Sequence, residues 1–337
     1  MDSSEQAALR EAVRDFCGKH AGPQAWDRLA GELGLTGLAV PECYGGSGAG
    51  LAEVAVAVEE TGRVLLPVPY LSTALAGAVL SEDGAGRTGG AAPGAEFLPG
   101  IASGALRAAF ALGSAVTASG GRLTGVAPHV LDGAEAGLFV VRAGDALFAV
   151  RAADTVVTPC GTLDQSRSQA AVSFQGAPAV AAGCAAERAE DLLRVMLAVE
   201  SAGAAAHCLD VTVGYLKTRV QFGRPIGAFQ ALRHRCADLA VEVASARATA
   251  YAAVRAAASP VSPASSAELA VLGPLAKRHC VDVFWHVAAE MIQLHGGIGF
   301  TWEHQAHRYL KRAKTSQLLH GTPAELRRLV SQRAGLS

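Results

Sequence analysis

The sequence predicts a mainly α-helical protein with a small antiparallel β domain at its centre. The pattern of apolar residues changes twice along the chain, and these two changes lead to this prediction. Apolar residues recur at helical spacing through the first ~80 residues and again from Ala185 onward, whereas short runs rich in Val, Phe and Leu fill residues 105–178. We therefore predict an N-terminal helical domain at 1–92, a middle β domain at 93–182 and a C-terminal four-helix-type bundle at 183–337.

The N-terminal region contains two clear helical patterns. In "EQAALREAVRDFCGKH" the apolar residues Leu9, Val13 and Phe16 fall on one face at spacings of four and three. The segment "LAEVAVAVEETGRVLLP" predicts another helix, which ends at Pro67. The Gly-rich run "GGSGAG" before it lacks the strand and helix of a dinucleotide fingerprint, so we interpret it as a surface loop. Residues 84–104 are rich in Gly, Ala and Pro, which is typical of a linker or a domain boundary.

The β domain and the bundle follow from local patterns in the rest of the chain. Gly and Asp separate the predicted strands "RAAFALG", "RLTGVAPHV", "AGLFVVRA", "ALFAVRA" and "QAAVSFQG". The predicted helices that follow occupy residues 185–218, 227–258, 264–294, 303–318 and 323–334. Long helices joined by short turns predict an antiparallel bundle.

Composition excludes several classes of function. The chain has 337 residues and a formal net charge of -1, so no basic field indicates a nucleic acid or a membrane surface as partner. No run of 18 apolar residues predicts a membrane span, and the acidic N-terminus does not resemble a signal peptide. Seven cysteines are scattered without CxxC pairs, which is typical of a cytoplasmic protein with reduced thiols.

The segment "YLKTRVQFGRPIGAFQALRHRCADLA" joins the first two bundle helices. A helix-to-helix corner, in which Gly223 ends the first helix and Pro225 starts the second, explains those two residues only. Arg219 and Phe222 remain unexplained. A guanidinium can clamp a phosphate and an aromatic ring can stack on a flat heterocycle, so this pair is a candidate nucleotide site.

Two further segments lie at predicted helix ends, one at the end of a helix and one at the start of the next. "QLHGGIGF" is either a simple Gly cap or a place where a ligand approaches bare backbone, with Gln293 as its polar contact. In "HGTPAEL", Thr322 is predicted as a helix N-cap with Glu325 completing a capping box, which leaves His320 unexplained. His304 and His307 could bind a metal, but no third ligand is evident and an exposed polar face is the simpler interpretation.

Taken together, these segments resemble the acyl-CoA dehydrogenase family. The resemblance covers nearly the whole chain and is strongest in "RVQFGRPIGAFQALRHRCADLA" and "QLHGGIGFTWEHQAHRYLKRAK". It implies FAD as cofactor, an acyl-CoA thioester as substrate, and an FAD site completed by a neighbouring subunit. It also implies that a carboxylate removes the α-proton while the β-hydride passes to flavin N5. The residues that it places against the pyrophosphate or adenine end of a neighbour's FAD are Arg219, Phe222, Gln230, Gln293, Gly296 and Gly297. Thr322 would lie near the flavin or pyrophosphate on the other side.

The chain departs from the family at both positions where a catalytic carboxylate is expected. The usual base is the Glu of an "EGT" motif 23 residues after the second Gly of the "GG" pair, and this count leads from Gly297 to His320. Other members carry the base just before an Arg that lies 25 residues ahead of the motif Arg. Counted from Arg219 that Arg is Arg194, so the base position is Leu193.

The β domain departs from the family as well. The resemblance implies a "TEP-x-x-GSD"-like stretch that touches the flavin. This chain has "FALGSAV" at residues 110–116, and only Gly113 and Ser114 remain.

Three functions compete at this point. The chain resembles the short, base-lacking subunit of actinobacterial-type heterotetrameric acyl-CoA dehydrogenases, which act on steroid side-chain thioesters as α2β2 assemblies with a homologous partner chain. It could instead be a self-sufficient homo-oligomeric flavoenzyme with His320 as base, since an imidazole is a fair base at neutral pH. The third hypothesis is a relative of the same fold that performs no dehydrogenation.

Overall fold

The computed structural model describes residues 4–82, 93–113 and 115–336. Its contacts group into two compact units. The first comprises residues 1–57, 66–193 and 257–260, and the second comprises residues 58–65, 194–256 and 261–337. Each unit is described by itself. The predicted domain boundaries at 92/93 and 182/183 stay predictions, and the first of them falls at the edge of a stretch outside the described residues.

The helices of the first unit bury apolar faces, as expected. Val13 and Phe16 are buried in the first helix, whereas Leu9 is only half-buried. Residues 95–102, predicted as linker, instead form helical turns with Phe97 and Leu98 buried, because these side chains are large and apolar. Residues 84–92 of that linker lie outside the described residues. The helices are α1 (Ser4–Lys19), α2 (Ala25–Gly31), α3 (Leu51–Arg63, divided between the units), α4 (Tyr70–Ser81) and α5 (Leu98–Ala102).

The middle of the chain forms two four-stranded sheets around one core. The sheet orders are β1-β4-β5-β8 and β2-β3-β7-β6. Both sheets contribute to the core, where Phe139 meets Phe174 edge to face at 6.4 Å between ring centroids. The strands are β1 (Ala108–Ala111), β2 (Ala115–Ser119), β3 (Arg122–Leu131), β4 (Leu138–Ala143), β5 (Ala146–Arg151), β6 (Val156–Pro159), β7 (Gln169–Pro178) and β8 (Val180–Ala181).

The predicted small antiparallel β domain is confirmed, and the structure adds a parallel pairing within it. All five predicted strands form, and β2, β6 and β8 are additional. β1 and β4 pair in parallel. Between them the chain makes β2 and β3 in the other sheet, and such a crossover returns β4 in the direction of β1.

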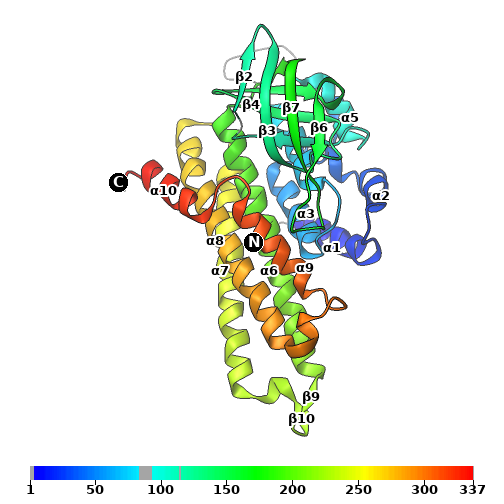
Figure 1. Cartoon of the computed structure of the whole chain (residues 1–337), viewed down its shortest axis with the longest axis vertical. Helices are drawn as coiled ribbons and strands as arrows, with labels where there is room; N and C mark the ends of the chain where they lie inside the picture. Colours follow the sequence, from blue (N-terminus) through cyan, green and yellow to red (C-terminus); the bar gives the residue numbers. More distant parts are fainter. Residues whose placement is uncertain (1–3, 83–92, 114, 337) are drawn as a thin grey trace. The chain divides into compact units, whose positions relative to one another are not determined.

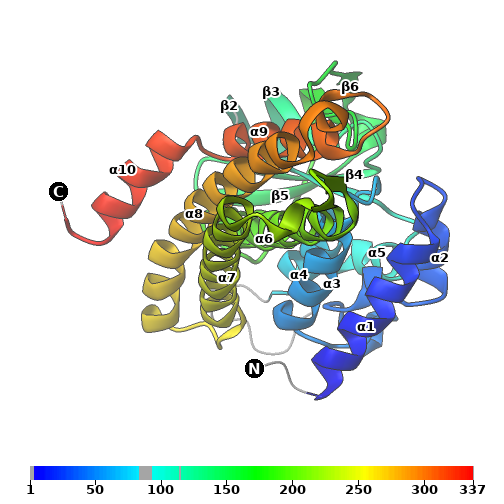
Figure 2. The same cartoon turned by 90° about the horizontal axis from the view of Figure 1, so that it is seen from below.

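The second unit contains the predicted bundle. Figures 1 and 2 show α6, α7, α8 and α9 lying side by side, and α10 contacts α8. The helices are α6 (Ala186–Thr218, in this unit from Arg194), α7 (Gln230–Ala258), α8 (Pro263–His295), α9 (Ala306–Leu318) and α10 (Pro323–Arg333).

Two features attach the end of α3 to the bundle: its backbone packs closely against α6, and the buried Glu59 carboxylate accepts hydrogen bonds from α7. A Cβ on Gly203 would lie 2.2 Å from the Glu59 carbonyl oxygen, so only glycine fits where α3 meets α6. The buried Glu59 carboxylate accepts hydrogen bonds from Arg247 Nε at 2.7 Å and from the Tyr251 hydroxyl at 2.6 Å. These bonds tie α3 to α7 as well.

Helix α6 is long and apolar enough to cross a membrane when judged by length and composition alone. However, 83% of its apolar window is buried inside the protein. A core helix passes the same test, so this is weak support for a membrane span.

Candidate functional site

The corner after α6 is a β-hairpin and not the predicted direct helix-to-helix turn. α6 ends at Thr218, and β9 (Val220–Gln221) pairs with β10 (Arg224–Pro225). Phe222 and Gly223 between them have φ values of 53° and 76°, the signature of a type I′ turn. The predicted roles of Gly223 and Pro225 are therefore wrong. Gly223 lies in the turn of the hairpin, Pro225 lies in β10, and α7 begins only at Gln230.

The hairpin holds three candidate residues with their functional groups unused. Arg219 is exposed, and its guanidinium makes no hydrogen bond or ion pair within the described residues. Phe222 is 90% exposed and touches Phe229 only edge to face, at 6.0 Å. Gln230 is exposed as the first residue of α7. Within the part of the chain that the structure describes, the corner thus presents an unpaired cation, an exposed aromatic ring and an unpaired amide.

The turn after α8 exposes the backbone of two glycines. Gly296 caps α8 with φ 61°, which confirms the predicted glycine cap. Gly299 is buried, and a Cβ there would lie 2.6 Å from the Ile292 carbonyl oxygen, so the 3-10 turn Gly296–Phe300 folds back onto the helix. Gly296 and Gly297 are exposed, with no atom within 4 Å of an added Cβ. A flat ligand could lie directly against this backbone.

Hairpin and turn lie at the same end of the bundle, the lower end in Figure 1. Tyr215, one turn before Arg219, stacks on His295, the last residue of α8, at 4.4 Å between ring centroids. Exposed Gln293, Phe300 (88%) and Trp302 surround the turn. We call residues 219–222, 230, 293, 296–298, 300 and 302 the hairpin–turn surface.

The remaining candidates, His320 and Thr322, lie at the break between α9 and α10. His320 and Gly321 have φ values of 51° and 111°. Arg194 Nε donates to the His320 carbonyl at 3.4 Å, and Lys277 Nζ, 0% exposed, donates to the Gly321 carbonyl at 2.6 Å. Two cationic side chains therefore hold the backbone of the break.

Thr322 is committed to the helix cap. Its hydroxyl donates to the Glu325 carboxylate at 2.9 Å and accepts the Glu325 N–H at 3.4 Å, which confirms the capping box. The hydrogen bond from the Thr322 N–H is the main cause that lowers the pKa of Glu325. The hydroxyl is thus already used inside the chain.

Neither of the two expected base positions carries a carboxylate. Arg194 contacts His320, and its neighbour in the chain is Leu193, which is 1% exposed. One position therefore holds an imidazole and the other a buried apolar side chain. Gly113 of "FALGSAV" follows β1 with φ 69°, while Ser114 lies outside the described residues.

The break and the hairpin–turn surface are well separated. Lys277 marks the break on α8, and Gln293 marks the surface on the same helix. The two residues are 16 positions apart on the helix, which corresponds to about 24 Å. The candidate residues therefore form two groups on one chain.

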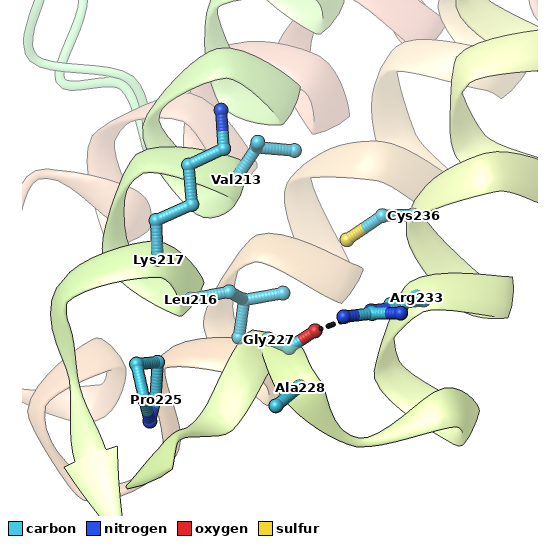
Figure 3. A pocket seen from close by; sticks show the side chains of 8 residues that line it. All are labelled: Val213, Leu216, Lys217, Pro225, Gly227, Ala228, Arg233 and Cys236. Carbon is cyan, nitrogen blue, oxygen red and sulfur yellow. Dashed lines mark hydrogen bonds between the residues drawn. The ribbon is translucent and has the colours of Figure 1, made fainter.

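A cavity of about 440 Å³ lies where α6 ends and α7 begins (Figure 3). Arg233 Nε donates to the Gly227 carbonyl at its edge, at 2.8 Å. Burial raises the pKa of the Cys236 thiol, so that group is protonated at neutral pH. The described lining contains neither a carboxylate nor an imidazole and thus offers no ordinary general base. It consists of Val213, Leu216, Lys217, Pro225, Gly227, Ala228, Arg233 and Cys236.

His304 and His307 do not form a metal site with a third ligand. Within the described ranges, no group of three His, Cys, Asp or Glu side chains could hold an ion. His304 Nδ1 instead accepts the Ala306 N–H at 3.2 Å, and His307 meets Trp302 edge to face at 4.8 Å between ring centroids.

Comparison with known proteins identifies the family of the chain. The model of the acyl-CoA dehydrogenase N-terminal domain matches residues 3–105, and that of the C-terminal domain matches residues 185–335. The chain belongs to the acyl-CoA dehydrogenase family. Members of this family are FAD-dependent oxidoreductases.

Individual relatives match along the whole chain. Acyl-CoA dehydrogenase IpdE2 of Mycobacterium tuberculosis is 37% identical over 344 residues, which cover 97% of either protein. FadE34 of the same organism is 36% identical over 96% of this chain and 45% of its own length. A variant of the steroid ACAD Tcur3481–Tcur3483 has a TM-score of 0.87 at 28% identity, covering 98% of each chain. The ChsE4–ChsE5 complex of M. tuberculosis has a TM-score of 0.86 at 25% identity, covering 100% of this chain and 99% of its own.

The chemistry of the hairpin–turn surface is compatible with the ADP half of FAD, the cofactor of this family. An exposed guanidinium suits a pyrophosphate, an exposed ring suits adenine, and exposed glycine backbone permits close approach. All these groups are exposed. At the break, by contrast, the Thr322 hydroxyl is used and no carboxylate occupies a base position.

Proposed function

We propose that this chain is the non-catalytic subunit of a heteromeric acyl-CoA dehydrogenase and completes the FAD site of a homologous partner. The observation that carries the proposal is the contrast between the two groups of residues. The hairpin–turn surface keeps an unused Arg219 guanidinium and a 90% exposed Phe222, while the base positions hold His320 and Leu193. Exposed groups of this kind gain a use only when another chain covers them.

Each residue of the surface has a defined task in this proposal. Arg219 neutralises the pyrophosphate through charge-assisted hydrogen bonds, and Phe222 covers the adenine. Gln230 and Gln293 supply amide contacts, and Gly296 and Gly297 let the cofactor approach the backbone. When bound, FAD supplies the acceptor for the hydride that leaves the substrate's β-carbon. The proton at the α-carbon is taken by a carboxylate outside this chain.

The self-sufficient alternative would need His320 to take that proton. Arg194 and Lys277 donate to the carbonyl oxygens of His320 and Gly321, so both cations are engaged with the backbone of the break. Neither expected base position of this chain holds a carboxylate, because they are His320 and Leu193. The absence of a carboxylate at both positions supports a partner-supplied base.

Substrate class, assembly and compartment are part of the proposal. The names of two similar structures, a steroid ACAD and a ChsE4–ChsE5 complex, support a steroid-type acyl-CoA thioester and a homologous partner chain. We propose an α2β2 assembly in the cytoplasm.

Co-expression with an acyl-CoA dehydrogenase chain encoded beside this one tests the proposal. We expect the chain purified alone to lack visible flavin absorbance, and the co-purified pair to carry about one FAD per two chains. A chain that binds stoichiometric FAD by itself and oxidises acyl-CoA would contradict the proposal. So would a pure chain that neither binds FAD nor retains any partner.

Replacing His320 with Ala should leave turnover of the two-chain complex within about tenfold, because no proton passes through this imidazole. A positioned base contributes about 10²–10⁴-fold, so the two hypotheses predict separable rates. Acyl-CoA oxidation with an artificial electron acceptor measures the effect, and the exposed His286→Ala is the matched control. A loss of about 10²-fold or more with unchanged FAD content would favour the self-sufficient enzyme.

A further inference from the structure

Three aromatic side chains form a column beneath the turn that carries Gly296 and Gly297. Tyr215 of α6 stacks on His295 of α8 at 4.4 Å and 25° between ring planes. His295 in turn lies 4.3 Å from His304, at 44°. Gly299 approaches the Cβ of His295, since an added Cβ there would lie 3.0 Å from it. The column therefore supports the turn from below.

The hydrogen bonds of the column require both imidazoles to be neutral. His295 Nδ1 lies 2.7 Å from the Met291 carbonyl and so carries its proton there. His295 is 3% exposed, and its buried Nε2 has no acceptor among the described residues for a second proton. His304 Nδ1 accepts the Ala306 N–H at 3.2 Å, and a proton on this nitrogen would break that bond.

The electrostatic surroundings act in the same direction. Burial lowers the pKa of His295, and burial followed by the charges of His295 and His307 lowers the pKa of His304. The ionisable groups that face the column are Tyr215 from α6 and His307 from α9, with Lys311 beyond Trp302. None of these is a carboxylate, and Glu303, next to His304 in the chain, is exposed.

We propose that the neutral Tyr215–His295–His304 column positions the Gly296–Phe300 turn for the partner's FAD, and that a proton on either histidine releases the partner. This rests on the proposed function. His295 directly precedes Gly296, so its displacement moves the backbone that receives the cofactor. Because the folded form favours neutral rings, association is complete above the ordinary histidine pKa of about 6.5 and declines as pH falls below it.

The test measures affinity for the partner chain and FAD retention by the two-chain complex between pH 7.5 and pH 5.5. We expect about a tenfold loss of both in the unmodified protein, which is the effect of one proton as pH falls from about 6.5 to 5.5. His295→Phe keeps a flat ring in the column but cannot take a proton, which leaves His304 as the titrating imidazole of the column, so its loss should be clearly smaller than that of the unmodified protein. The double variant His295→Phe/His304→Asn should lose less than threefold. The control is His286→Phe, on the same helix but exposed and paired with Glu242, which should behave like the unmodified protein.

An unaltered pH dependence in His295→Phe would overturn the proposal. If that variant folds poorly, His304→Asn replaces it, because its amide oxygen can still accept the Ala306 N–H. The His304→Asn variant must likewise reduce the pH dependence of partner affinity and FAD retention.

A failure of the proposed function is distinguishable from a failure of the column. If no partner binds at any pH, ¹⁵N NMR of the chain alone follows the Gly296 and Gly297 amides. Shifts with a midpoint below about pH 6.5 support the column, and amides that do not titrate overturn it.

Discussion

Arg219→Ala should weaken FAD retention by the two-chain complex about 10- to 150-fold without unfolding either chain. The guanidinium is exposed and makes no hydrogen bond or ion pair within the described residues, so its loss removes no internal polar interaction. Hydrogen bonds to charged groups contribute about 1.5–3 kcal/mol, which gives this range. The fluorescence of FAD released across a dilution series measures it.

The control for Arg219 is Arg28→Ala, which removes an exposed guanidinium on α2 that pairs only with Glu32 in a surface ion pair. We expect it to leave FAD retention unchanged, since such pairs contribute little. Equal retention by Arg219→Ala and the unmodified complex would remove Arg219 from the cofactor site. Destabilisation of the chain alone by Arg219→Ala would instead indicate a structural role.

Gly297→Leu should abolish detectable binding of the partner's FAD while the chain folds normally. No atom lies within 4 Å of an added Cβ at Gly297, and its φ is not positive, so the backbone accepts a side chain. The same side chain would occupy the space above the bare backbone where the proposal places the cofactor. We expect at least a 100-fold loss of FAD affinity, since a displaced ligand forfeits several contacts at once.

A matched control is Gly18→Leu, another exposed glycine with open space around it, near the end of α1. Both variants should keep the thermal midpoint of the unmodified chain to within a few degrees. Titration calorimetry of the variant chains with the FAD-loaded partner separates them. Full affinity in Gly297→Leu would show that the cofactor does not lie over this turn.

Local signals made part of this fold and site predictable from sequence. The helix predicted at 264–294 is α8 at Pro263–His295, because a proline start, an apolar stripe and a glycine end act within a few residues. The capping box at Thr322 and the cap at Gly296 follow from equally short patterns. Resemblance then indicated which exposed residues at the corner and turn to consider together.

Interactions between distant segments were not predictable in this way. The parallel pairing of β1 with β4 depends on where β2 and β3 go, and no local pattern encodes that choice. The hairpin was missed because Gly and Pro punctuate helices and turns alike. Lys277 is one of several polar residues on α8, and nothing local marks its hydrogen bond to the Gly321 carbonyl 44 residues away. The column of Tyr215, His295 and His304 likewise joins three elements.

The break at His320 and the hairpin–turn surface lie about 24 Å apart along α8. Mutations can therefore change one of these sites without changing the other. After a gene duplication, one copy can lose its base without damaging the surface that serves its sister. If the sister later loses the reciprocal surface, neither copy works alone and neither can be deleted. The two chains then depend on each other although catalysis has not improved, because each chain has lost a part of the site that the other still has.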